Sequence, residues 1–542
     1  MNLDLFMAVS STGPEGMVDL NKFRLRRFVE KLNELGEVDV IKKPTDLSDL
    51  AALIEENPRA IWFKNVGPDN LEIVASVNGS RYRIAKAMNV SPDDLVAEYR
   101  NRLKYPQPVV EIKNPDAPVQ KVVLTGKDAD LSRLPFYVQH QLDGSPYISS
   151  AIDYTVDPET GTTNVGCRRL SLRNSKEAGT NLTAPSDLKR IYTEACKKGK
   201  RLDISFAIGS HPIDYLAAGM RIPADEISLV STLRGEPLPL VKSISNDIRV
   251  PADAEMIVEG YLDERGYIEP DGPYGEYVGF YGPMHQDPVF HVTAITMRED
   301  VLHQTLFHGA GLQIHRAESV HLMSVGLEAK ALTILEQENI DVRDVFVPPS
   351  SAEGQHLRVS IAQKHAGDVK KVISALINNM FVTKHVFVVD EDINIRDENH
   401  WEWALVSRLQ ADRDISTFPE RPGMPMDPSL DAGKSGTKAG FDLTLPIKRR
   451  GELMLTIATA PKIKSSKRFT SAREAISKEG AMFLSDIIAA LGSKDGREVI
   501  MELDEIRQDG KLMRDKDGRY LIGDSTRGIT GISGDQYEDP NS

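Results

Sequence analysis

The chain has few cysteines and no excess of positive charge. Among its 542 residues only Cys167 and Cys196 are cysteines, and their separation fits neither a zinc motif nor a thioredoxin motif, which excludes a cysteine-rich scaffold. The formal net charge of −14 argues against binding to nucleic acid or to anionic membranes, because both need a basic face. This charge still permits a local cationic pocket for an anionic ligand.

The amino terminus has none of the features of a targeting segment. Residues 1–9 lack a basic leader before their apolar side chains and are too few to span a bilayer. A hydrophobic content of 40% with 27% charged residues is ordinary for a soluble globular protein, and 542 residues predict two to four domains. Since cysteines are so rare, a reducing compartment fits best, and we expect a cytoplasmic protein with no membrane or nucleic-acid partner.

The first predicted domain, residues 1–125, is of α/β type. Apolar side chains on one face predict a helix that begins at the N-cap Asp19 and ends at Gly36. The other predicted elements are strands over 60–66 and 71–76 and a helix that opens at residues 91–94.

The second predicted domain, residues 126–340, is rich in strands and turns. Segments 147–156 and 163–172 predict a hairpin with a five-residue loop. A mostly β barrel or sandwich would account for this hairpin, for a helix near 186–198 and for further strands at 203–208, 238–244 and 289–297.

Two more regions follow. Residues 341–465 predict an α/β domain, which opens with a strand, a helix and a strand at 355–363, 367–380 and 385–390. Residues 466–542 predict one helix between a capping box at Ser471 and a stop at Gly492, followed by a loose tail over 523–542.

The most informative segment is 267–276, which places Asp271 and Glu276 on a turn. Gly272, Pro273 and Gly275 prevent a helix there, so the two acids lie on a shaped loop. In a pocket without water, two close carboxylates would repel, which would raise the pKa of one and give an acid beside a base. A surface turn with solvated acids is the alternative, and the segment taken alone favours it.

The strand over 163–172 contains Arg168 and Arg169 in an otherwise apolar setting. A buried arginine needs a carboxylate or phosphate partner, since an unpaired buried charge costs about 3 to 5 kcal/mol. Strand alternation places Arg169 on the face of Cys167 and opposite to Asn164. If Asn164 and Arg169 serve one site, Gly166 must supply a bulge or kink.

Taken in order, these motifs match a known pattern. The pattern consists of motifs that follow one another along the chain: the arginine strand, Glu226, the segment 245–247, a Glu-Gly pair at 259 and the acidic turn. The segment 435–442 adds another match. The chain resembles the UbiD family of decarboxylases, which use a prenylated flavin mononucleotide (FMN), over residues 20–465. The resemblance implies a central flavin-binding split β-barrel between an amino-terminal α/β domain and a carboxy-terminal α/β domain used in oligomerisation.

The resemblance also implies roles for individual residues. Arg169 is similar to the family's catalytic arginine and Glu276 to its acid/base carboxylate, while Asp271 stands where the family commonly has a glutamate that partners the arginine. An arginine between two carboxylates can keep one ionised while the other carries the proton. The residues implied in cofactor binding are Asn164, Cys167, Arg168, Arg169, Glu226 and Lys438.

The implied metal site departs from the family. Asn164 and Glu226 resemble ligands of a divalent metal, Mn2+ or Mg2+, that ties the cofactor phosphate to the protein, with Lys438 at the phosphate and K+ as a further candidate ion. The family's histidine ligand has no counterpart, because residues 170–210 contain no histidine. Oxygen ligands suit these metals, and the nearest are on Thr183, Ser186 and Asp187. Alternatively the metal is absent, and Lys438 and water complete the phosphate site.

A second departure is the segment 307–315, which differs from the Gly-Arg-Pro-Pro-like segment that the family often has. Four histidines lie within nineteen residues, but their spacings fit no simple ligand pair, and structural histidines are the favoured interpretation. Because this segment lies near the substrate pocket in the family, His308 is a candidate for substrate contact.

The implied activity is reversible, non-oxidative decarboxylation of an aromatic, heteroaromatic or α,β-unsaturated carboxylic acid through a covalent prenylated-flavin adduct. The substrate is a small-molecule carboxylate, either a free acid or a coenzyme A thioester. The family further implies a homo-oligomer, dimer or hexamer, and a flavin prenyltransferase that supplies the cofactor. Two alternatives are a flavin-binding homologue with a redox or carboxylating role and a non-catalytic homologue without the metal site.

Overall fold

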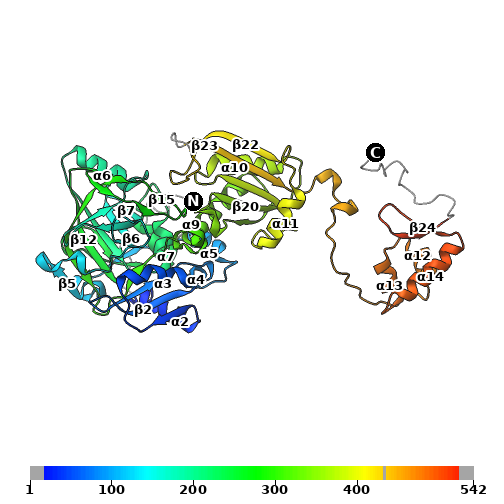
Figure 1. Ribbon diagram of the computed structural model, residues 1–542, viewed down its shortest axis with the longest axis horizontal. Coiled ribbons are helices and arrows are strands. Elements are labelled where there is room, and N and C mark those ends of the chain that lie inside the picture. Colours follow the sequence, from blue (N-terminus) through cyan, green and yellow to red (C-terminus); the bar gives the residue numbers. More distant parts are fainter. Residues whose placement is uncertain (1–17, 310, 431–434, 524–542) are drawn as a thin grey trace. The chain divides into compact units, whose positions relative to one another are not determined.

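The structure is a computed structural model and describes residues 18–309, 311–430 and 435–523 (Figure 1). The chain divides into two compact units, Met1–Thr444 and Leu445–Ser542. The first unit contains every residue of the predicted site. Its end at Thr444 lies before the expected boundary at 465.

The amino-terminal region is a four-stranded sheet with helices around it. Its strands run in the order β1 (Val38–Ile41), β2 (Ala60–Val66), β3 (Leu71–Ala75) and β18 (His303–Thr305), and its helices are α2 (Leu25–Glu34), α3 (Leu50–Glu56), α4 (Arg81–Ala87) and α5 (Leu95–Arg102). Both predicted strands are confirmed. The predicted helix over 19–36 was wrong at its start: Asp19 Oδ1 accepts a hydrogen bond from the main-chain N–H of Asn21 in a turn, and the helix begins at Leu25.

Six strands close the central barrel, in the order β12 (Met256–Leu262), β9 (Leu202–Ile208), β6 (Tyr147–Val156), β7 (Thr163–Leu172), β8 (Glu177–Thr180) and β17 (Val289–Met297), with β12 paired back to β17. β5 (Val122–Thr125) adds to β17 outside the closed ring. The hairpin predicted over 147–172 is confirmed with the same bounds. Three helices lie between barrel strands along the chain. Helix α6 (Asp187–Lys197) lies between β8 and β9, and helices α7 (Pro212–Ala218) and α8 (Ile227–Arg234) lie between β9 and β12.

Three small sheets lie outside the barrel. β10 (Leu238–Lys242), which we had assigned to the barrel or sandwich, pairs instead with β4 (Val109–Glu111) and β11 (Arg249–Pro251). The acidic segment forms two short antiparallel pairs, β13 (Glu269–Asp271) with β16 (His285–Asp287) and β14 (Tyr274–Gly275) with β15 (Tyr281–Gly282).

The carboxy-terminal part of the first unit is an α/β layer. Its sheet has the order β19 (Val342–Phe346), β20 (His356–Ile361), β21 (His385–Asp390), β23 (Ser435–Leu443) and β22 (Ile415–Pro422), and its helices are α9 (Glu318–Gln337), α10 (Asp368–Asn379) and α11 (Glu398–Arg408). β20 and β21 are parallel, with α10 between them in sequence, which confirms the predicted β-α-β unit.

The second unit has its own small core around Ile476, Ile487 and Leu503. It consists of α12 (Ala472–Glu479), α13 (Leu484–Leu491), α14 (Arg497–Gln508) and the hairpin β24 (Leu512–Arg514) and β25 (Tyr520–Ile522). The single helix predicted up to Gly492 was wrong, because Gly480 at φ 86° ends α12. The predicted tail lies, from residue 524 on, outside the described residues. Within those residues, no helix is long and apolar enough to cross a membrane.

Candidate active site

Arg169 lies between two carboxylates. Its Nη1 donates to Oδ2 of Asp271 at 2.7 Å, and its Nη2 lies 3.8 Å from Oε1 of Glu276. Arg169 belongs to the barrel strand β7, Asp271 ends β13, and Glu276 follows β14. The structure therefore brings together all three residues to which catalytic roles were assigned.

The two acids differ in their electrostatic surroundings. Burial acts to raise the pKa of Asp271, but the charge of Arg169 and a hydrogen bond from Ser171 outweigh it, and that pKa is lowered. Burial raises the pKa of Glu276, and the more distant Arg169 opposes this only in part. Near neutral pH, Asp271 is therefore the ionised partner, and Glu276 is the better holder of a proton.

Two tyrosines hold the guanidinium in place. The guanidinium carbon of Arg169 lies 4.3 Å from the ring centroid of Tyr274 and 5.1 Å from that of Tyr147, a cation–π arrangement. The hydroxyl of Tyr147 also donates to Oδ1 of Asp271 at 3.2 Å. Sequence reasoning missed Tyr147, and it had noted Tyr274 only as part of the turn.

His285 extends the charge network behind Asp271. It lies opposite Asp271 in the β13–β16 pair, and its Nδ1 donates to the main-chain oxygen of Pro283 at 3.0 Å. Nε2 therefore faces Asp271 at 3.5 Å and the fully buried Asp287 at 3.3 Å, a contact that is attractive only when Nε2 also carries a proton. The neighbouring carboxylate of Asp287 indeed raises the pKa of His285.

The side chains of Asp271, His285 and Asp287 each offer an atom that could bind a metal ion, and these atoms lie within 4.8 Å of one another. The guanidinium of Arg169 already supplies the cation at Asp271, so we interpret the group as an ion-pair network that fixes the acid on β13.

The turn before Glu276 is braced by His140 and Asp143. The main-chain N–H of Gly275 donates to Oδ1 of Asp143 at 2.9 Å, and Nδ1 of His140 lies 3.2 Å from Asp143. A Cβ at Gly275 would lie 2.3 Å from the His140 ring, so only glycine fits there. This contact explains a glycine that the sequence had marked only as a helix breaker.

Glu276 lines a cavity of about 730 Å3 together with Tyr281 and His140. His308 lies beside this wall: its ring centroid is 5.9 Å from that of Tyr274, and burial lowers its pKa to about 3. Its Nδ1 is buried without a partner among the described residues, so a neutral imidazole is available to a ligand. Glu353, which sequence reasoning missed, is held at φ 59°, and burial raises its pKa to about 7, with a further contribution from Glu276.

Asn164 and Glu226 form a separate cluster on the other face of β7. The Asn164 amide donates to Oδ2 of Asp153 at 3.0 Å, and Glu226 accepts from the main-chain N–H of Val165 at 2.9 Å. The bulge in this pairing lies in β6 between Ile148 and Ala151, so Gly166 does not supply the bulge that one shared site for Asn164 and Arg169 would have required. Asn164 and Arg169 therefore stay on opposite faces of their strand.

Family models match the chain in three consecutive parts. They are the N-terminal domain, the Rift-related domain and the C-terminal domain of 3-octaprenyl-4-hydroxybenzoate carboxy-lyase, over residues 29–103, 110–311 and 320–443. The chain belongs to the UbiD family. The predicted family and fold are thereby confirmed, and the matches end just before the second unit begins.

Solved UbiD structures agree with this assignment. The UbiD-class enzyme HmfF from Pelotomaculum thermopropionicum, in complex with FMN, is 31% identical with a TM-score of 0.75, and the match covers 81% of this chain and 98% of that one. Vanillic acid decarboxylase from Sedimentibacter hydroxybenzoicus in its open form is 26% identical with a TM-score of 0.73, over 84% and 98% of the two chains.

The fold also matches 3,4-dihydroxybenzoic acid decarboxylase from Enterobacter cloacae, with a TM-score of 0.75 at 23% identity over 82% of this chain and 98% of that one. The UbiD family consists of carboxy-lyases, so this chain is a carboxy-lyase, and the neighbours solved with FMN or prenylated FMN support a flavin cofactor.

The Asn164 cluster fits the divalent metal that UbiD enzymes imply. Burial, and next the neighbouring carboxylate of Asp187, raises the pKa of Glu226 to about 7, and burial raises that of Asp153 to about 6. Buried oxygen donors whose charges oppose one another are stabilised by a cation such as Mg2+ or Mn2+. Asp153, which also pairs with Arg168 at 3.1 Å, is therefore a further candidate beside the expected substitutes for the missing histidine.

Those substitutes have other partners. Thr183 Oγ1 donates to Asn181, Ser186 caps α6, and Asp187 pairs with Arg221 at 2.9 Å. Lys438 also lies apart from the cluster: its Nζ donates to the main-chain oxygens of Met380 and Phe381 at 3.0 and 2.8 Å.

Lys438 has no contact with Asn164 or Glu226 in the described part of the chain, so the structure does not bring it to the metal cluster. Of the other predicted cofactor residues, Cys167 is exposed, and Arg168 pairs with Asp153 at 3.1 Å.

Proposed function

We propose that this chain decarboxylates an aromatic, heteroaromatic or α,β-unsaturated carboxylic acid, with carboxylation as the reverse reaction. The observation that carries the proposal is Arg169, paired with Asp271 at 2.7 Å and lying 3.8 Å from Glu276 at the wall of a cavity of about 730 Å3. A related structure is named for vanillic acid, an aromatic acid, which supports this substrate class.

In this proposal Arg169 binds the substrate carboxylate. The guanidinium can form paired hydrogen bonds with it, because only Nη1 is closely engaged by Asp271 while Nη2 is 3.8 Å from Glu276. Asp271 and Tyr147 keep the guanidinium oriented during this step.

Glu276 then supplies the proton that replaces the departing carboxylate. Its raised pKa lets the carboxyl group hold a proton to higher pH than an ordinary glutamate does. Activity should fall as the pH rises through this pKa, because the ionised Glu276 has no proton to give.

Prenylated FMN, when bound, would supply the electron sink for decarboxylation. We assign its anchoring to Arg168 and to a divalent ion held by Asn164, Glu226 and Asp153, on the contacts described above. The proposal includes a flavin prenyltransferase as the source of the cofactor, a cytoplasmic location and a homo-oligomer. An evolved HmfF solved as a dimer with prenylated FMN supports the last of these.

The test is Glu276→Gln, purified after co-expression with a flavin prenyltransferase. Release of carbon dioxide from a panel of aromatic and heteroaromatic acids and their coenzyme A thioesters should fall by about 10²- to 10⁴-fold. The flavin absorbance should stay nearly unchanged. Glu269→Gln is a matched control, because Glu269 is an acid of the same segment whose side chain is 45% exposed and paired with Arg173.

Retained turnover in Glu276→Gln would reject this residue as the proton donor. A wild-type protein with no bound chromophore under any condition would reject the flavin enzyme altogether.

A further inference from the structure

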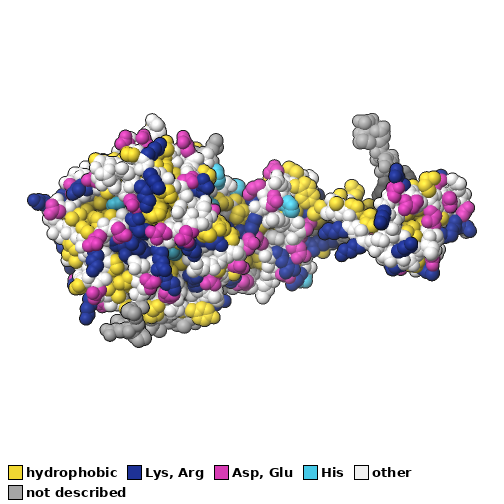
Figure 2. Space-filling view, turned by 90° about the horizontal axis from the view of Figure 1, so that it is seen from below, with side chains coloured by type: hydrophobic (Ala, Val, Ile, Leu, Met, Phe, Trp, Pro, Cys, Tyr) yellow, Lys and Arg dark blue, Asp and Glu magenta, His cyan; other side chains and the backbone are white. Residues whose placement is uncertain are grey.

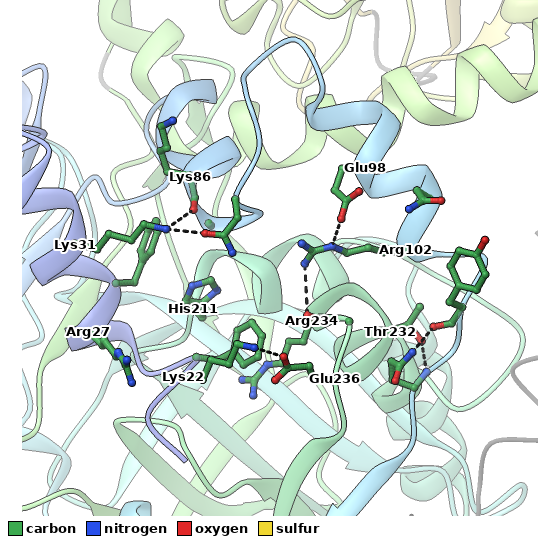
Figure 3. Close-up of a pocket in the computed structure, with 18 residues that line it drawn as sticks. Lys22, Arg27, Lys31, Lys86, Glu98, Arg102, His211, Thr232, Arg234 and Glu236 are labelled. Carbon is green, nitrogen blue, oxygen red and sulfur yellow. Dashed lines mark hydrogen bonds and ion pairs between the residues drawn. The ribbon is translucent and has the colours of Figure 1, made fainter. Parts of the chain in front are cut away.

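A second cavity lies in the amino-terminal part of the first unit. It has a volume of about 620 Å3, and α2, α5, the end of α4 and the end of α8 contribute to its wall. The described residues that line it are distinct from those around Glu276. Figure 3 shows Lys31 on one side, Arg102 on the other and His211 between them.

Positive side chains outnumber negative ones in this wall, although the whole chain has a net charge of −14. Both glutamates are already paired: Glu98 accepts from Arg102 at 2.8 Å, and Glu236 accepts from Lys22. Figure 2 shows that the face carrying α2 otherwise mixes the two signs of charge. The six basic residues of the cavity are Lys22, Arg27, Lys31, Lys86, Arg102 and Arg234.

Two of these charges have no acid partner. Arg234 is neutralised by Asp214 and Asp253, which are outside the wall, at 2.7 and 2.6 Å. Lys31 Nζ, in contrast, donates only to neutral oxygens, the main-chain oxygen of Lys86 at 3.2 Å and Oδ1 of Asn89 at 2.7 Å. Lys86 forms no ion pair with any described acid.

The same two lysines repel each other. Burial, and then the charge of Lys86, lowers the pKa of Lys31. Lys31 has only neutral acceptors, and the ammonium of Lys86 lies 4.9 Å from the ring centroid of Tyr82, so a bound anion would stabilise both charges.

His211 adds a directed donor at the centre of the cavity. It is 4% exposed, and its Nδ1 accepts from the main-chain N–H of Ile213 at 3.4 Å, which places the ring hydrogen on Nε2. No described residue accepts a hydrogen bond from Nε2. Burial lowers the pKa of His211 well below its usual value, so the ring is a neutral donor. The rings of Phe23 and Phe28 pack edge-on against the imidazole ring, with ring centroids 5.4 and 4.9 Å from that of His211.

We propose that this cavity binds a small molecule that carries a phosphate group. Lys31, Lys86 and the Nε2–H of His211 supply charge and direction for a compact, multiply charged anion, as phosphate sites require. The volume of about 620 Å3 exceeds the needs of an inorganic ion and falls in the range of organic ligands, and the rings of Phe23 and Phe28 give part of the wall an apolar surface. The site is independent of the decarboxylation chemistry proposed above.

The test is calorimetric titration of the flavin-loaded full chain with pyrophosphate, inorganic phosphate and citrate at constant ionic strength. Flavin loading keeps the cofactor's own phosphate site filled. Lys31→Gln/Lys86→Gln should weaken pyrophosphate binding at least tenfold. Lys42→Gln/Lys43→Gln, which removes two exposed charges from the same domain, is the control and should stay within twofold of wild type.

Asn89→Asp is a second, nearly isosteric variant. Asn89 has φ 60°, which aspartate also tolerates, and the new carboxylate would accept from Lys31 and repel the anion. Stronger binding of citrate than of either phosphate compound would overturn the phosphate assignment. Absence of saturable binding, or an equal loss in the Lys42/Lys43 control, would overturn the site itself.

Discussion

Replacement of Asp271 by asparagine is the sharpest test of the three-charge arrangement. The Arg169–Asp271 pair is 2.7 Å long, and its side chains are 8% and 2% exposed. Removing one charge from a buried pair costs about 3 to 5 kcal/mol. The single oxygen of asparagine can still accept from Arg169, and its amide N–H can donate to the hydroxyl of Tyr147, so the lower end applies. We therefore expect a loss of about 3 kcal/mol in unfolding free energy. We also expect kcat/KM to fall, because the guanidinium that faces Glu276 is no longer held by a charge.

The pH dependence of activity distinguishes a loss of coupling between the two acids from a general distortion of the site. The charge of Asp271 raises the pKa of Glu276, and a released Arg169 could pair fully with Glu276 and lower it. The loss of activity at high pH should therefore begin at lower pH in Asp271→Asn than in wild type. Carbon dioxide release across a pH series measures both effects.

Asp263→Asn is the control, because Asp263 is similarly buried and paired with Arg265 and His291, but has no contact with Arg169. An alkaline limit that stays in place or moves upward in Asp271→Asn would refute the coupling between the two acids. So would a kcat/KM that changes no more in Asp271→Asn than in the control.

Three further changes test other parts of the structure. In His285→Asn the alkaline limit of activity should move upward, since His285 lowers the pKa of Glu276. Because the pKa of His285 is itself raised, the stability that His285 contributes is complete below about pH 6.5 and is lost as the pH rises through its folded pKa. The difference in Tm from wild type should therefore shrink as the pH rises above about 6.5. Gly275→Ala should cost about 1–3 kcal/mol of unfolding free energy and lower turnover through the clash with His140, whereas Gly367→Ala, which meets open space, should be nearly neutral in thermal unfolding. A chain that ends at Thr444 should keep its fold and decarboxylase activity, since the family matches end at residue 443; loss of the folded state by circular dichroism would contradict this.

The sequence predicted the parts of the fold that depend on local patterns. The hairpin of β6 and β7 follows from alternation and a short turn, and its bounds agree with the structure. The break of the second unit's helix at Gly480 was missed because an apolar stripe continues across it. A bulge at Gly166 would have been needed only if Asn164 and Arg169 served one site, and the strand pairing puts the bulge beside Ser149 and Ser150 instead.

At the site, the sequence identified groups but not their neighbours. Arg169, Asp271 and Glu276 come from ordered motifs, but the contact of His285 with Asp271 depends on the register of β13 and β16, which local patterns do not fix. Asp153 could have been found, because it is the one charged residue in an otherwise uncharged strand, the same signal that marked Arg169.

Both acids lie in the segment 269–287, whose short strands pair with one another, while Arg169 belongs to the closed barrel. The proposed proton donor and the guanidinium proposed to bind the carboxylate thus come from separately paired parts of the chain. A transplant of this segment between relatives would leave every strand pairing of the barrel intact. Natural variation or laboratory recombination could therefore change the two acids in one step, without rebuilding the barrel that carries Arg169.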